Sequence, residues 1–113
     1  MKEENTEKRY NLQERFIVYA ATIIKLTENI PDTKAGKHIC SQILRSGTSP
    51  APNYGEAQSG ESIKDFIHKI KIGLKELRET LICLRIIYRT KLRKSENKIE
   101  TSIKEMMNLS QNL

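Results

Sequence analysis

The sequence is poor in the residues from which sheets, disulfide frameworks and membrane spans are built. It has no Trp, and aromatic residues make up 5% of its 113 residues. Because strands favour aromatic and β-branched residues, this composition disfavours a sheet protein. No apolar run approaches the roughly 18–20 residues that a membrane-spanning helix needs. The charged start of the chain, residues 1–9, is not followed by the apolar core of a signal peptide, so we expect a cytoplasmic protein with no membrane partner.

Motifs for metal, cofactor and covalent chemistry are also scarce. The two cysteines, Cys40 and Cys83, lie in apolar periodic segments, where a lone pair is typical of reduced, buried thiols in a reducing compartment. His38 and Cys40 are two residues apart, which on a helix directs them to different faces, and no second ligand pair has metal-site spacing. Glycine-rich phosphate loops, HExxH and GxSxG patterns do not occur. We therefore expect no metal, no cofactor, no catalytic residue and no enzyme activity.

Apolar residues instead recur every three or four positions in four segments, and no segment alternates as a strand does. This pattern predicts an all-α protein, an antiparallel up-down-up-down four-helix bundle in which long helices are joined by short connections. A chain of 113 residues forms one domain. The predicted helices cover approximately residues 8–29, 33–57, 62–92 and 95–111. Ser95 is expected to cap the last of them, whose apolar face is Ile99, Ile103, Met106 and Met107.

The first two predicted helices differ in how clearly their ends are marked. Asn11 starts a capping-box pattern for the first helix, and Pro31 stops it, because proline disfavours helical geometry in the preceding residue. The second helix starts near Thr33 and then meets residues 46–60, SGTSPAPNYGEAQSG. The prolines and glycines there favour a long loop. A helix with a kink or break near residues 47–55 is the alternative, if neighbouring groups satisfy the carbonyls that the prolines leave unpaired.

The third predicted helix has the clearest apolar pattern. Ser62, with Asp65 three residues later, is a second capping-box candidate. The predicted core stripe alternates by four and three residues: Ile63, Ile67, Ile70, Leu74, Leu77, Leu81, Leu84 and Tyr88. Further apolar residues lie off this stripe: Phe66, Ile72, Ile82, Ile86 and Ile87. Because apolar residues on two sides of one helix are typical of subunit contacts, we expect a homo-oligomer.

Positive charge is concentrated on the third predicted helix. Residues 64–94 hold ten basic and three acidic residues, a net charge of +7, whereas the rest of the chain sums to −1. On a heptad wheel the basic residues fall on two adjacent positions beside the core stripe, over about four helical turns or more. We name this set the basic stripe: Lys64, His68, Lys71, Lys75, Arg78, Arg85 and Arg89.

Several interpretations of the basic stripe stay open. Acids of a neighbouring helix or subunit can neutralise it, and the first segment supplies four candidates: Glu3, Glu4, Glu7 and Glu14. Alternatively, the stripe binds the phosphates of RNA or DNA with little sequence preference, since the chain has no base-reading motif. An enzymatic interpretation, with His68 as general base and Glu56 facing a cleft, lacks a nucleophile. More simply, Glu56 caps a helix end or forms an ion pair with a basic residue.

Two stretches, ILRSGTSPAPNYGEAQ (residues 43–58) and DFIHKIKIGLKELRETL (residues 65–81), resemble the bacterial four-helix-bundle family of ribosomal RNA intervening-sequence proteins. Members are encoded in insertions within 23S rRNA genes and as free-standing genes. The resemblance covers roughly residues 10–110. It is carried by one motif: Ser49, Asn53, Glu56, Ala57, Phe66 and His68. Pro50, Pro52 and Gly55 depart from the family's usual pattern.

The resemblance implies an antiparallel, left-handed bundle assembled into a ring-like homopentamer, with a second helix that runs through part of residues 46–57. The accessory protein of diversity-generating retroelements is similar in architecture, and is a basic pentamer thought to contact nucleic acid and a reverse transcriptase. No catalytic residue comes with the family. We therefore predict a non-enzymatic, oligomeric helical bundle that binds RNA or DNA electrostatically through the basic stripe. The alternative is a protein-interaction or scaffold module with no nucleic-acid role.

Overall fold

The computed structural model describes residues 2–60, 62–94, 101 and 103–108, and every regular element among them is a helix. These helices are α1 (Lys2–Thr27), α2 (Lys34–Thr48), α3 (Pro50–Gln58) and α4 (Ile63–Thr90), and residues 103–108 are also helical. The prediction of an all-α protein is confirmed. Within the described part of the chain, no helix is long and apolar enough to cross a membrane.

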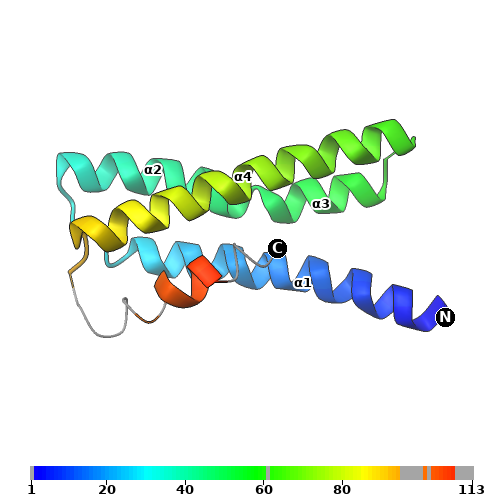
Figure 1. The fold of residues 1–113 in the computed structure, drawn as a ribbon, viewed down its shortest axis with the longest axis horizontal. Coiled ribbons are helices and arrows are strands. Elements are labelled where there is room, and N and C mark those ends of the chain that lie inside the picture. Colours follow the sequence, from blue (N-terminus) through cyan, green and yellow to red (C-terminus); the bar gives the residue numbers. More distant parts are fainter. Residues whose placement is uncertain (1, 61, 95–100, 102, 109–113) are drawn as a thin grey trace.

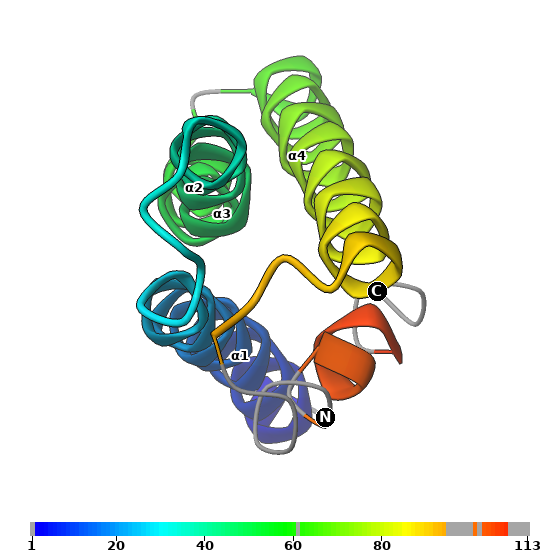
Figure 2. The same ribbon diagram turned by 90° about the vertical axis from the view of Figure 1, so that its left-hand side faces the viewer.

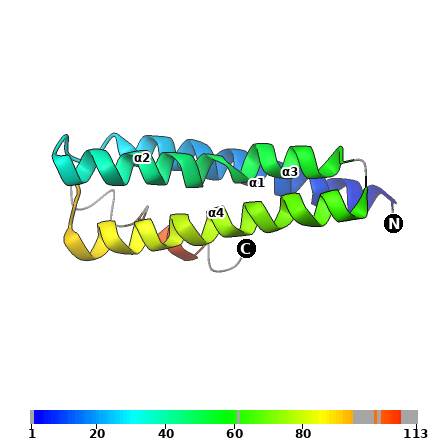
Figure 3. The ribbon, with the colours of Figure 1, turned by 90° about the horizontal axis from the view of Figure 1, so that it is seen from above.

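The helices form three long rods and one short one (Figure 1). α2 and α3 lie end to end as one rod, and α4 runs back along it (Figure 3). α1 packs below this pair, and the short helical segment at residues 103–108 lies beside α1 and below α4 (Figure 2). Of the fourth predicted helix, residues 101 and 103–108 are described, and they are helical. Ser95 and Ile99, its predicted cap and first apolar residue, lie outside the described residues.

The proline-containing segment is helical, so the loop that propensity favours over residues 46–60 is wrong. Ser49 separates α2 from α3, yet it keeps right-handed helical geometry, with φ −70° and ψ −34°. Its N–H donates to Arg45 O at 3.2 Å, and the N–H of Asn53 donates to Ser49 O at 3.1 Å. Pro50 opens α3 at a position where the missing N–H has little consequence. The prolines therefore interrupt the hydrogen-bond ladder without turning the chain away.

Of the predicted helix caps, Ser62 is present and Asn11 is wrong, and Thr33 provides a cap that was not predicted. The Thr33 hydroxyl accepts the N–H of Gly36 at 3.0 Å and caps α2. The Ser62 hydroxyl accepts the N–H of Asp65 at 3.1 Å and caps α4. A cap at Asn11 is wrong, because α1 already begins at Lys2 and passes through this position as helix.

The buried face of α4 is rotated away from the predicted core stripe. Its buried residues are Leu77, Thr80, Cys83, Leu84 and Ile87. Leu77 and Leu84 belong to the predicted stripe, but Ile63, Ile67 and Leu74 are 80%, 46% and 39% exposed. Ile87, predicted on a second apolar face, is fully buried, whereas Phe66, Ile82 and Ile86 are exposed as predicted.

The rotation follows from what packs against α4. The flank bearing Thr80 meets α2, where the hydroxyls of Thr80 and Ser46 are 2.8 Å apart and both side chains are fully buried. On the opposite edge of the predicted stripe, the described contact is that of Lys104, which lies over the Tyr88 ring near the C-terminal end of α4. A heptad wheel assumes equal partners on both flanks, whereas the described residues cover the α2 flank more extensively.

Candidate functional site

All seven residues of the basic stripe are exposed and lie on the outer face of α4. At 100° per residue, they project away from the side that buries Thr80 and Ile87. α4 is one uninterrupted helix from Ile63 to Thr90, so the stripe is not broken by a bend or loop. From Lys64 to Arg89 it spans about 37 Å at 1.5 Å per residue. The sequence prediction of an exposed, continuous cationic face therefore holds, whereas its binding role stays a prediction.

Two of the three acids of α4, Glu76 and Glu79, pair with α2 and not with the basic stripe. Arg45 of α2 bridges both, with Nη1 3.1 Å from Glu76 Oε2 and Nη2 2.8 Å from Glu79 Oε2. The hydrogen bond to Glu79 and the charges of both acids raise the pKa of Arg45. On the same flank, Lys69 Nζ lies 2.9 Å from Glu56 Oε2, so the prediction that Glu56 pairs with a basic residue is confirmed. These pairs bind α4 to α2 and α3 and leave the outer face cationic.

The basic stripe is not neutralised within the described side chains. None of its seven residues forms an ion pair with any of them. Glu14, a candidate partner from the first segment, is exposed and likewise has no such pair. The side chains of Glu3, Glu4 and Glu7 lie outside the described part. Like charges three or four residues apart repel one another, so this face favours an anionic partner.

The C-terminal half of the basic stripe also carries apolar surface. Ile82 is 55% exposed and Ile86 is 42% exposed. Together with Arg85 and Arg89 they line a shallow hollow on the outer face of α4. A partner that binds here meets both cations and aliphatic groups. Ile82 and Ile86, which the apolar pattern predicts at subunit contacts, thus lie next to the arginines of the stripe.

The family motif has mainly a structural role in this fold. The Asn53 side-chain amide donates to Ser49 O at 3.0 Å, across the start of α3. Ala57 is buried, and Glu56 forms its ion pair with α4. These residues hold α3 in line with α2 and against α4. His68 and Phe66 are exposed on α4, and no contact in the described structure explains the phenylalanine.

The candidate chemical residues are not brought together. His68 lies on the outer face of α4, whereas Glu56 is engaged by Lys69 on the flank facing α3. Cys40 and Cys83 are free thiols, and burial raises the pKa of both. His38, two residues from Cys40, is exposed. Among the residues that the structure describes, no three His, Cys, Asp or Glu side chains are grouped as a metal site.

Comparison with known proteins gives the chain a family. The sequence model of the 23S rRNA-intervening sequence protein family matches residues 8–113. The chain belongs to this family. A crystal structure of a protein of unknown function from the S23 ribosomal protein family, from Bacteroides thetaiotaomicron VPI-5482, is similar to it with a TM-score of 0.73 and 30% identity. That match covers 93% of this chain and 96% of the other. No curated protein sequence matches this chain.

Membership of the intervening-sequence family accounts for the helical bundle and does not assign its activity. The solved relative is itself described as having unknown function. Two features of this family member were missed by the sequence analysis. One is the bridge from Arg45 to two acids of α4, which joins residues more than 30 positions apart. The other is an apolar groove beside Gly73, for which the sequence held one signal: a glycine in the middle of a long helix.

Proposed function

We propose that this intervening-sequence protein binds RNA or DNA through the basic stripe of α4 and catalyses no reaction. One observation carries the proposal. Six lysine and arginine residues and His68 share an exposed helix face about 37 Å long, and none of them is paired with a described acid. Arg45 and Lys69, the cations that are paired with acids of the neighbouring helices, both lie off the stripe.

The chemistry of the stripe favours contacts with the phosphate backbone. Lysine and arginine that neutralise phosphates release condensed counterions, which favours binding at low salt. The stripe has no Phe, Tyr or Trp on which unpaired bases could stack. Its length is close to one turn of a duplex, about 34–36 Å. We therefore propose a double-stranded ligand, recognised by shape and charge with little sequence preference.

The test is fluorescence anisotropy with generic duplex RNA and duplex DNA of mixed sequence, at low salt and then at rising salt. The proposal expects saturable binding to both, which weakens steeply as salt rises. Matched duplexes of different sequence should bind with similar affinity. Failure to bind either duplex at low salt, by protein that keeps its helix content and assembly state, would sink the proposal and favour the protein-interaction module.

The rival function has its own supporting observation. Ile82 and Ile86 place aliphatic surface between the arginines of the stripe. Protein interfaces combine apolar cores with arginine more often than phosphate-binding surfaces do. On this alternative, the stripe binds an acidic protein surface or another subunit, and the chain acts as a scaffold with no nucleic-acid role.

We also propose that the protein is a homo-oligomer, a homopentamer as the family resemblance implies. The support is a second exposed apolar surface, on the outer face of α1, where Ile17, Val18 and Ile24 are 47%, 55% and 48% exposed. Changing Ile17 and Ile24 together to glutamate is expected to lower the assembly to monomers, because subunit contacts exclude charges from their apolar centre. Sedimentation equilibrium measures this. An unchanged mass in the double variant would place the contacts elsewhere.

A non-enzymatic role is supported by the separation of His68 from Glu56. A general base needs a nucleophile or substrate proton within hydrogen-bond reach, and His68 projects from the outer face of a single helix. Any turnover found in a substrate screen is expected to be unchanged in His68→Ala. Turnover lost in that variant would make the chain an enzyme.

A further inference from the structure

A hollow lies between α2 and α4, on the side of the bundle that faces away from α1. Its volume is about 250 Å³, and it is lined by residues of these two helices: Gln42, Arg45, Glu79, Ile82, Cys83 and Ile86. Figure 3 shows α2 and α4 side by side, with α1 and the segment at residues 103–108 behind them. Within the described structure, no helix therefore covers this hollow.

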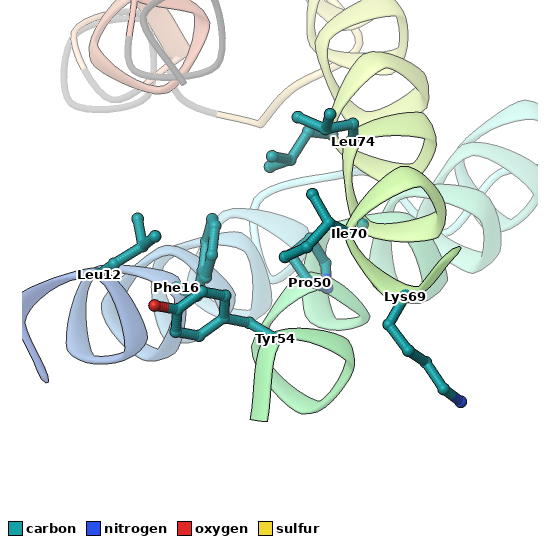
Figure 4. Close-up of a pocket in the computed structure, with 9 residues that line it drawn as sticks. Leu12, Phe16, Pro50, Tyr54, Lys69, Ile70 and Leu74 are labelled. Atoms are coloured by element: carbon teal, nitrogen blue, oxygen red, sulfur yellow. The ribbon is translucent and has the colours of Figure 1, made fainter. Parts of the chain in front are cut away.

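The hollow is separate from the apolar groove beside Gly73 and from the cations of the basic stripe. In that groove, Ile70 and Leu74 extend from α4 towards α1 (Figure 4), and no residue lines both the groove and the hollow. Ile82 and Ile86 border the stripe, but no lysine or arginine of the stripe lines the hollow. Binding in the hollow therefore needs none of the cations that are proposed to contact phosphates.

The wall that α2 contributes to the hollow is basic. α2 contains no aspartate or glutamate. Arg45 lines the hollow, and His38 and Lys34 share its helix face two and three turns earlier, where both are exposed. The Arg45 guanidinium contacts Glu76 and Glu79, yet its side chain is 57% exposed and has more N–H donors than these acids occupy. An acid of a partner can therefore reach Arg45 from outside.

The outer face of α1 has an apolar centre with an acid at each end. Ile17, Ala21 and Ile24 are exposed and follow one another at four and three residues. Glu14 precedes them by three residues and Glu28 follows them by four, and both are exposed. Neither acid forms an ion pair with a described side chain. This surface therefore suits a partner surface that combines aliphatic groups with basic residues.

Contact between two α1 faces is disfavoured. If α1 packed antiparallel against α1 of a second copy, centred on Ala21, the Glu14 of each copy would lie opposite the Glu28 of the other. Like charges that face each other across an interface are unfavourable. A ring with an odd number of subunits, such as the proposed homopentamer, also requires contact between two different surfaces, because two-fold contacts join subunits only in pairs.

We propose that α1 of one copy packs into the hollow between α2 and α4 of the next copy. Ile17 and Ile24 then contact Ile82 and Ile86, and an acid of α1 reaches Arg45. Each copy supplies one α1 and receives another, so repetition of this contact closes a ring. The inference rests on the proposed homo-oligomer and specifies the two surfaces that meet in it.

The test uses two variants that each damage one surface. Gln42→Glu with Ile86→Glu, the hollow variant, places charges in the hollow. Both positions are exposed, so the fold should be retained, as circular dichroism can verify. Sedimentation equilibrium is expected to show monomers for this variant, as for the double-glutamate variant of α1. The matched control, Gln58→Glu with Ile63→Glu, makes the same exchanges at exposed positions outside both surfaces and should keep the mass of the unmodified protein.

Mixing the two variants identifies the surfaces that meet. The hollow variant keeps an intact α1 and the α1 variant keeps an intact hollow, so one productive contact remains between them. An equimolar mixture, at concentrations where each variant alone is monomeric, is expected to form a dimer of twice the 13.1 kDa mass of one chain and nothing larger. This inference alone fails if the mixture stays monomeric or the hollow variant keeps the mass of the unmodified protein. The homo-oligomer fails as well if the unmodified protein is itself a monomer.

Discussion

Changing Arg78 and Arg85 together to glutamate is expected to abolish binding to RNA and DNA while leaving the helix content unchanged. Both side chains are exposed on the outer face of α4, and neither pairs with a described acid. The change removes two phosphate contacts and introduces two repulsive charges. Since a hydrogen bond to a charged group contributes about 1.5–3 kcal/mol, affinity should fall by about 100-fold or more.

The matched control for this variant reverses two exposed cations away from the stripe. Lys25 near the end of α1 and Lys34 at the start of α2 are both exposed, so Lys25→Glu with Lys34→Glu alters the net charge by the same amount. Anisotropy at one low salt concentration compares the two variants. We expect the control to keep most of its affinity, because exposed charges more than about 10 Å from a phosphate are largely screened. Equal losses in both variants would show that net charge, and not the stripe, drives binding.

Gly47→Ala is expected to lower the free energy of unfolding by about 1–3 kcal/mol. An added Cβ at this position would lie 2.8 and 2.9 Å from the Ile23 side chain, which is fully buried between α1 and α2. The helices must move apart or Ile23 must change its conformation, and either response disrupts packing. Glycine is therefore needed at residue 47 for the close approach of α1 and α2.

The same substitution at Gly73 provides the comparison. Because no atom lies within 4 Å of the added Cβ, Gly73→Ala removes only the conformational freedom of glycine and should raise the stability by about 0.5–1 kcal/mol. Urea denaturation followed by circular dichroism measures both variants. Stabilities that change in the same direction would contradict the described packing around these two glycines.

Local features of the fold could be predicted from the sequence because their causes lie within a few residues. Ser62 caps its helix through an N–H group three residues away. The exposure of the basic stripe follows from helical periodicity, since six lysine and arginine side chains on one face cannot be buried together. A family motif within residues 43–81 also sufficed to predict the helical bundle.

The path through Pro50 and Pro52 could not be predicted from propensity. Helical geometry survives there because groups from elsewhere support the segment. The Gln13 side-chain amide of α1 donates to Ala51 O at 3.0 Å, a contact between residues 38 positions apart. Tyr54 packs edge-on against Phe16, with ring centroids 5.6 Å apart. Proline and glycine lower the local propensity for helix, and here contacts with another helix override that propensity.

The orientation of α4 was mispredicted for a related reason. The apolar periodicity marked Ile63, Ile67 and Leu74 as core, but a stripe is buried only where another helix covers it. The flank that α2 covers contains Thr80, whose hydroxyl is acceptable in the core because Ser46 pairs with it. A hydrogen bond between residues 34 positions apart leaves no periodic signal in the sequence.

The salt dependence of duplex binding tests the central claim most directly. Plots of log affinity against log salt should be linear for the unmodified protein and for Arg78→Ala with Arg85→Ala. If both arginines neutralise phosphates, the slope of the double variant should be smaller in magnitude by about 1.8 on duplex DNA, at about 0.9 for each phosphate contact. An unchanged slope would mean that neither arginine touches a phosphate, and the outer face of α4 would not be the nucleic-acid surface.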